Sequence, residues 1–69
     1  MKFSERLREL RKGKKETQIQ TANAVEITSR QLQELEAGKS FPNFHTLWAL
    51  ADHFGVSVDY LMGRSNERV

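Results

Sequence analysis

The sequence predicts an all-α protein, a compact five-helix bundle that contains a helix-turn-helix. Residues Gln18 to Gly38, QIQTANAVEITSRQLQELEAG, read as two short helices separated by a tight turn. Apolar residues elsewhere recur at helical spacing, and the alternation that is typical of strands is absent. Internal repeats and low-complexity segments are absent too, so the 69 residues are expected to form one domain.

Capping boxes mark two helix starts in this stretch. Thr17-x-x-Gln20 and Thr28-x-x-Gln31 have the spacing in which each side chain accepts a hydrogen bond from an otherwise unpaired backbone N–H. The boxes lie eleven residues apart, which leaves room for only a short turn. Ala22 fits this arrangement, since steeply crossing helices need a small side chain where they meet. A helix-turn-helix presents its second helix to the DNA major groove, so we expect sequence-specific binding of duplex DNA.

The first helix is expected over residues 3–12, with its apolar residues on one face and Gly13 at its end. Residues 38–43 are expected to form a loop, because Gly38 suits a helix C-cap and Pro42 prevents helix continuation. The apolar face of the first helix consists of Phe3, Leu7 and Leu10.

Two further helices complete the predicted bundle. Asn43 is a good N-cap for a fourth helix that Gly55 ends, and Ser57 caps a short fifth helix that Gly63 ends. The apolar stripe of the fourth helix is expected to face the core and consists of Phe44, Leu47, Leu50, Ala51 and Phe54. The inward residues of the fifth helix are Val58 and Leu61. The DNA-binding domain is therefore expected over residues 1–63, followed by a short C-terminal tail at residues 64–69.

Composition argues against several other classes of protein. The chain has no cysteine, which excludes disulfides and Cys-based zinc or redox sites. His45 and His53 have no matching ligand cluster, so no metal and no cofactor are expected. No apolar run could span a bilayer and no signal peptide opens the chain, so the protein is expected to be soluble and intracellular. Paired carboxylates, a nucleophile with a base, and a phosphate loop are absent, so no enzymatic activity is expected.

The basic residues gather near the N-terminus. Residues 2–15 hold seven lysines and arginines and two glutamates, a balance of +5, whereas the remainder carries −3 and the whole chain +2. A basic end can mark a phosphate-facing surface. It can equally be the solvated face that an amphipathic helix needs, and both interpretations apply here.

Several motifs stand in order along residues 3–63. They are LRELRK (7–12), Thr17-Gln18, Ala22, Ile27-Thr28, Leu32, Leu35-Glu36-x-Gly38-Lys39, Pro42 and LWALADHFGVSVDYLMG (47–63). Their joint order and spacing closely resemble the lambdoid phage repressor and Cro-type helix-turn-helix family of bacterial and phage transcriptional regulators. The resemblance implies a cytoplasmic, bacterial or phage-encoded homodimer that binds double-stranded DNA, with no small-molecule ligand and no membrane as a partner.

The resemblance also assigns positions to the DNA contacts. The glutamine that opens the second helix, Gln18, would hold a phosphate near the edge of the half-site. The third helix would read base edges through Ser29, Arg30, Gln33 and Glu34, with Gln31 nearer a capping role. Arginine suits guanine, glutamine suits adenine, and glutamate suits the cytosine amino group. Each of these residues could instead belong to a solvated helix face.

Further roles follow from the same resemblance. Arg11 and Glu36 match an ion pair that ties the first helix to the end of the third, and Arg11 could also face a phosphate. The loop after the third helix would contact phosphates through Lys39, Ser40 and Asn43. The residues expected at a dimer interface are Phe41, Tyr60 and Met62.

Some positions depart from the family pattern. Glu26 stands in the tight turn and Lys15 in the preceding loop, where the family usually has glycine, so the turn conformation is in question. Thr21 and Glu16 replace apolar residues, which predicts either looser packing or a slight rotation of the second helix. Ile19 replaces a polar residue and could meet a partner. His45, Asp52 and His53 are expected on the solvent side of the fourth helix, without a special role.

The leading hypothesis is a transcriptional regulator, a dimeric repressor that reads a palindromic operator through the major groove. The alternative is a protein-interaction module, such as an antitoxin or a regulatory partner with the same fold. Ile19, Phe41 and the acidic residues of the third helix would then form the contact surface.

Overall fold

The computed structural model describes residues 1–67, and within this range the chain forms five helices and no strand. They are α1 (Phe3–Gly13), α2 (Gln18–Ala24), α3 (Ser29–Glu36), α4 (Phe44–Phe54) and α5 (Val58–Leu61). The predicted five-helix fold is confirmed. Of the tail expected at residues 64–69, residues 68 and 69 lie outside the described residues.

The predicted helix starts are those of the structure. The hydroxyls of Thr17 and Thr28 accept hydrogen bonds from the backbone N–H groups of Gln20 and Gln31, at 3.1 and 3.0 Å. Each glutamine side chain accepts in return from the threonine backbone N–H, at 2.8 Å in both boxes. Two reciprocal caps therefore fix the first residues of α2 and of α3, and the second cap closes the turn between them.

The connections depend on residues with positive φ. Gly55 ends α4 with φ 66°, and Gly63 has φ 80° in a place where a Cβ would overlap the carbonyl oxygen of Met1. Lys15 and Glu26 adopt φ 60° and 61° in the loops before and after α2. Both are the positions where the sequence departs from the family's glycine, so the turn keeps its conformation despite the side chains.

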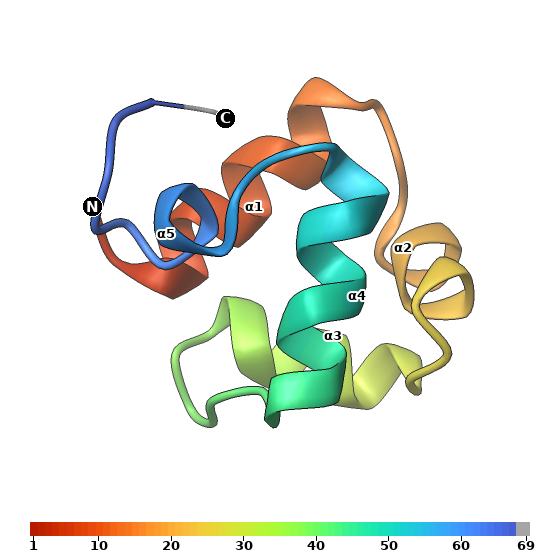
Figure 1. Ribbon diagram of the computed structural model, residues 1–69. Helices are drawn as coiled ribbons and strands as arrows, with labels where there is room; N and C mark the ends of the chain where they lie inside the picture. Colours follow the sequence, from red (N-terminus) through yellow and green to blue (C-terminus); the bar gives the residue numbers. More distant parts are fainter. Residues whose placement is uncertain (68–69) are drawn as a thin grey trace.

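The helices pack around one core. Helix α2 packs on α3, α1 packs on α3 and α5, and α4 packs on α5. In Figure 1, α4 crosses the middle of the molecule, with α1 and α5 on one side and α2 on the other. Leucines from four helices meet in the centre and are fully buried: Leu7, Leu32, Leu50 and Leu61. This core holds α2 and α3 at a fixed angle to each other.

One part of the predicted core is wrong. Phe44 was expected to face inward, but 74% of it is exposed, and Thr46 is buried in its place. Thr46, Leu50 and Ala51 form the buried side of α4, and Phe44 lies at the edge of this side in the first turn, where it is exposed. There it stacks on Trp48, with ring centroids 5.7 Å apart. Spacing alone placed Phe44 at the edge of the stripe and could not decide which way the first turn faces.

Candidate nucleic-acid interface

The exposed side of α3 gathers most of the residues predicted to read bases. Arg30, Gln33 and Glu34 line a shallow hollow of about 280 Å³ together with Lys39 from the following loop. Ser29, the first residue of α3, is partly buried and lies outside this lining. The structure thus brings three of the four predicted base-reading residues together with one predicted phosphate contact.

Arg30 and Glu34 pair with each other along the helix. The closest approach of their charged groups is 3.8 Å, between residues four apart, and both side chains reach solvent. Exposed pairs of this kind are worth about 0.3–0.5 kcal/mol. Such a weak pair leaves both side chains able to exchange partners for base edges.

Glu36 anchors a network at the end of α3. Its buried carboxylate accepts from Arg11 Nε at 2.6 Å, from Arg11 Nη2 at 3.1 Å and from Gln18 Nε2 at 3.1 Å. Its backbone carbonyl accepts from Arg8 Nη2 at 2.9 Å. The carboxylate therefore ties α1 and the first residue of α2 to the end of α3, and it fixes where the Gln18 amide stands.

Arg11 and Gln18, which the Glu36 carboxylate binds, differ in how accessible their remaining N–H donors are to DNA. Arg11 is mostly buried, and three of its five N–H groups are bonded within the protein, two to Glu36 and one, on Nη1, to the carbonyl of Glu16 at 2.9 Å. Gln18 gives one amide hydrogen to Glu36 and lies at the N-terminus of α2, where backbone N–H groups attract anions. Gln18 is accordingly better placed than Arg11 to hold a phosphate.

The loop between α3 and α4 borders a second hollow. Ser40, Asn43 and Phe41 line a depression of about 270 Å³ beside Gln31 and Glu34. The side-chain oxygen of Asn43 caps α4, because Oδ1 accepts a hydrogen bond from the backbone N–H of Thr46 at 2.8 Å. The side-chain nitrogen of Asn43, unlike the oxygen, is a donor and can therefore bond to a phosphate.

A polar cluster joins the loop before α2 to α2 itself and to α4. Glu16 Oε1 accepts from the Thr21 hydroxyl at 2.6 Å and lies 2.7 Å from His53 Nε2, while Lys14 Nζ donates to the His53 carbonyl at 2.9 Å. The expectation that His53 lies in solvent without a role is therefore wrong. Thr21 is fully buried, and its hydroxyl finds its hydrogen-bond partner in Glu16. His53 is the second partner of the Glu16 carboxylate.

The environment of Glu16 changes its pKa. Burial alone would raise the pKa of this carboxyl, but hydrogen bonds from His53 and Thr21 and the charges of His53 and Lys14 outweigh it, so the pKa is lowered. The charged form is the one that holds the loop before α2 to α4.

Two arginines of α1 were missed by the sequence reasoning. Arg6 is buried, with Nη1 donating to the Tyr60 carbonyl at 2.9 Å and its guanidinium 3.8 Å above the Tyr60 ring. Its position three residues after Phe3 and four before Leu10 places it on the apolar face, and this spacing could have revealed it. Arg8 caps the last turn of α3, and the sequence carries no local signal for that long-range contact.

The residues predicted for a dimer interface differ in exposure. Phe41 is 81% exposed and Met62 is exposed, whereas Tyr60 is 9% exposed and belongs to the core beneath Arg6. Tyr60 therefore has little surface to offer a partner.

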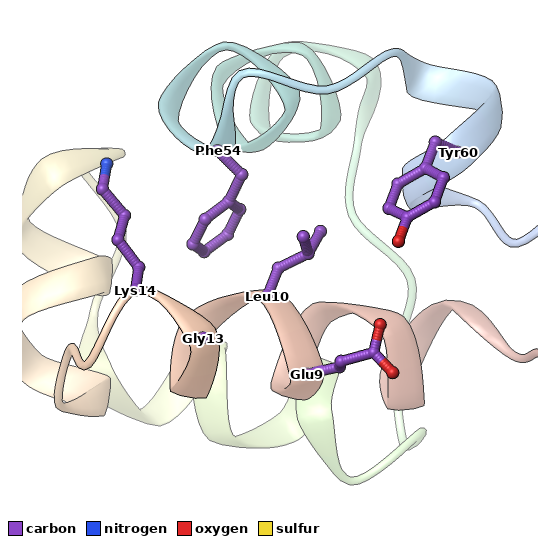
Figure 2. A pocket seen from close by; sticks show the side chains of 6 residues that line it. All are labelled: Glu9, Leu10, Gly13, Lys14, Phe54 and Tyr60. Carbon is purple, nitrogen blue, oxygen red and sulfur yellow. The ribbon is translucent and has the colours of Figure 1, made fainter. Parts of the chain in front are cut away.

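A third groove lies away from α3. It holds about 400 Å³ and is lined by Glu9, Leu10, Gly13, Lys14, Phe54 and Tyr60. Figure 2 shows Leu10 and Phe54 between Lys14 at one end and Glu9 and Tyr60 at the other. Within residues 1–67, no group of three histidines or acidic residues could hold a metal ion. In the same range, no helix has the length and apolar character that crossing a membrane requires.

A buried core that fixes α2 against α3, together with an exposed polar face on α3, defines a helix-turn-helix domain. A family model described as a helix-turn-helix domain matches residues 4–67, and the chain belongs to this family. The solved P22 c2 repressor, in complex with a synthetic operator, is similar in structure with a TM-score of 0.89 and 28% identity, over 94% of this chain and 98% of that one. These matches confirm the resemblance to phage repressors.

Several curated proteins are similar to this chain in sequence. The transcriptional regulator YqaE of Bacillus subtilis is 41% identical over 97% of this chain and 59% of its own length. The phage CTXphi repressor RstR of Vibrio cholerae is 36% identical over 93% and 57%, and the activator BcrR of Enterococcus faecalis is 36% identical over 90% and 30%. The chain thus spans about a third to three-fifths of these relatives. All are named as regulators of transcription, and none as an enzyme.

Proposed function

We propose that this chain is the DNA-binding part of a transcriptional regulator, a dimeric repressor that reads a palindromic operator with α3 in the major groove. The observation that carries the proposal is the exposed cluster of Arg30, Gln33 and Glu34 beside Lys39, on a helix that the core and Glu36 hold in place. The likeness to a solved repressor in complex with a synthetic operator supports binding of duplex DNA.

In the proposed complex each group has one task. Arg30 and Gln33 donate to base edges, and Glu34 accepts from a cytosine amino group. The phosphate contacts come from Gln18, Lys39, Ser40 and the amide of Asn43, because a helix N-terminus and a basic loop position the duplex without reading it. The side chain of Glu36 contacts no DNA and fixes Gln18 relative to α3.

The proposal is tested by selecting bound sequences from a random duplex pool and then measuring affinity at several salt concentrations. We expect enrichment of a palindrome and a logarithm of the binding constant that falls linearly with the logarithm of salt concentration. Failure to bind any duplex at low salt would reject the proposal.

One observation favours a second function. Ile19 is 62% exposed on α2, at a position where the family usually has a polar residue, so a protein partner could cover it. Binding of a partner protein that Ile19→Arg abolishes, in a chain that fails to bind duplex DNA, would favour this alternative.

A further inference from the structure

The proposed DNA contacts leave the aromatic face of α4 unused. Phe44 and Trp48 stack on one another with 74% and 55% of their surfaces exposed, and they line a mainly apolar hollow of about 670 Å³ with His45, Ala49 and Asp52. A helix face of this kind is expected to be covered by a partner.

We infer that a second copy of this chain covers this face, with the two α4 helices packed antiparallel around Trp48 and Ala49. The dimer so formed is the one that the proposed repressor requires, and in this respect the inference rests on the proposed function. A two-fold axis makes every contact occur twice, so the face must be complementary to itself.

The order of residues along α4 provides this self-complementarity. His45 and Asp52 lie seven residues apart, two turns of the same helix, with Trp48 and Ala49 midway between them. In an antiparallel pair centred on Trp48 and Ala49, His45 of each copy meets Asp52 of the other. The hydrogen bond that the His45 ring can donate to the facing Asp52 carboxylate then fixes both the direction and the register of the two helices.

The central residues fit the same arrangement. Ala49 is small and leaves space for the indole of the facing Trp48, which allows the helix axes to approach within about 8–10 Å. Phe44 extends the apolar contact at each end. Buried aromatic anchors surrounded by polar residues are typical of the centre of an interface.

The available area is consistent with a reversible dimer. Aromatic side chains bury about 150–250 Å² each, so the exposed parts of Phe44 and Trp48 supply roughly 250 Å² of apolar surface per copy. A stable interface buries about 800 Å² per partner, and the surrounding polar residues of α4 would add to this centre. We therefore expect dissociation at low concentration.

The single tryptophan of the chain is Trp48, so its fluorescence reports directly on this face. We expect the emission of the wild-type protein, measured without DNA, to shift to shorter wavelength with increasing concentration, in parallel with dimer formation in sedimentation equilibrium. A dimer that forms with no change in tryptophan emission would overturn the inference, as would a protein that stays monomeric at about 1 mM.

Variants test the register as well as the surface. Trp48→Ala should raise the dimer dissociation constant about 10- to 100-fold, and Ile19→Ala, an exposed apolar control on α2, should leave it unchanged. His45→Glu places like charges opposite Asp52 and should weaken the dimer, while adding Asp52→Lys should restore it. If the double variant dimerises no more tightly than His45→Glu alone, the antiparallel register is excluded.

The outcome is separable from the proposed function. Trp48→Ala lies outside the proposed DNA contacts, so its monomer should still bind a single half-site with the salt dependence of a wild-type protomer. Loss of the dimer with retained half-site binding supports both proposals. A dimer without any DNA binding supports only the interface.

Discussion

Glu26 holds a backbone conformation that its residue type disfavours. Its φ of 61° lies in the left-handed region, where a side chain costs about 1–2 kcal/mol relative to glycine. Lys15 bears the same kind of strain in the loop before α2. Both residues are exposed, so the capping boxes and the core, rather than their own side chains, impose the turn.

Glu26→Gly should therefore stabilise the protein by about 0.5–1 kcal/mol, since the relief of strain exceeds the added flexibility of the unfolded chain. Urea denaturation at constant m-value measures the change. Asn23→Gly, at an exposed position inside α2, serves as the control and should destabilise. A loss of stability on Glu26→Gly would mean that the Glu26 side chain has a compensating partner.

Arg30 and Lys39 line the same hollow but should act differently on DNA. Arg30→Ala should cost about 1–3 kcal/mol on the preferred site and little on unrelated duplex, because a bidentate base contact is lost. Lys39→Ala should weaken all sequences similarly and lower the salt slope by about 1 per protomer. Fluorescence anisotropy on selected and random duplexes measures both. Equal losses on the two duplexes for Arg30→Ala would show that α3 does not read bases.

At the scale of elements, local signals predicted where each helix begins and long-range contacts decided the rest. The Thr17 and Thr28 boxes were readable because a cap involves residues only three apart. The partnership of Glu16 with His53 spans thirty-seven residues, so no local pattern announces it. We predicted looser packing of α2 because Glu16 and Thr21 were each taken alone, whereas in the structure these two polar residues bond to each other.

The Glu36 network makes the end of α3 sensitive to a single change. Glu36→Gln should destabilise by about 3–5 kcal/mol, because it leaves the mostly buried Arg11 guanidinium without its counter-charge. Glu34→Gln, on the same helix and in an exposed pair, is the matched control and should change stability by less than about 0.5 kcal/mol. Chemical denaturation of both variants measures the difference. Similar small effects would mean that the Arg11–Glu36 pair adds nothing to folding.

The polar cluster around Glu16 predicts a loss of stability in acid. The folded-state pKa of Glu16 is lowered from its ordinary value of 4.5, so its contribution is fully present above that value and disappears as pH falls through the folded-state pKa. The groups that face it are Lys14, Thr21 and His53. Denaturation midpoints of wild type and Glu16→Gln should converge as the pH decreases below about 4.5. A constant difference across this range would show that the Glu16 charge is not stabilising.

At the scale of the whole molecule, the sequence was sufficient for the fold, because helix starts and apolar faces follow from short-range spacing, whereas the residues of the α3 cluster were assigned by the resemblance to phage repressors. It was insufficient for the exposed surface. Phe44 was predicted to face the core, and only the packing of α4 against α5 shows that Phe44 and Trp48 face outward. Arg6 is the opposite case, a charged residue that is buried. Its guanidinium can lie inside because it donates to the Tyr60 carbonyl and packs on the Tyr60 ring.

The size of the molecule limits how it can read DNA. Its dimensions are 28 × 22 × 20 Å, smaller than the distance of about 34 Å between successive major grooves on one face of the duplex. A single copy therefore reaches one half-site, with a few base contacts from one α3. Useful discrimination of an operator requires a second copy related by a two-fold axis, and the operator must share that symmetry.

We accordingly expect hydroxyl-radical footprints on the selected operator to show two protected half-sites about one helical turn apart. Inserting about five base pairs between them rotates one half-site to the opposite side of the duplex, so joint occupancy should be lost while each half-site still binds weakly. Inserting the same length outside the operator is the control and should change nothing. Protection confined to one half-site at saturation would contradict dimeric reading, because the second copy would then have no groove to enter.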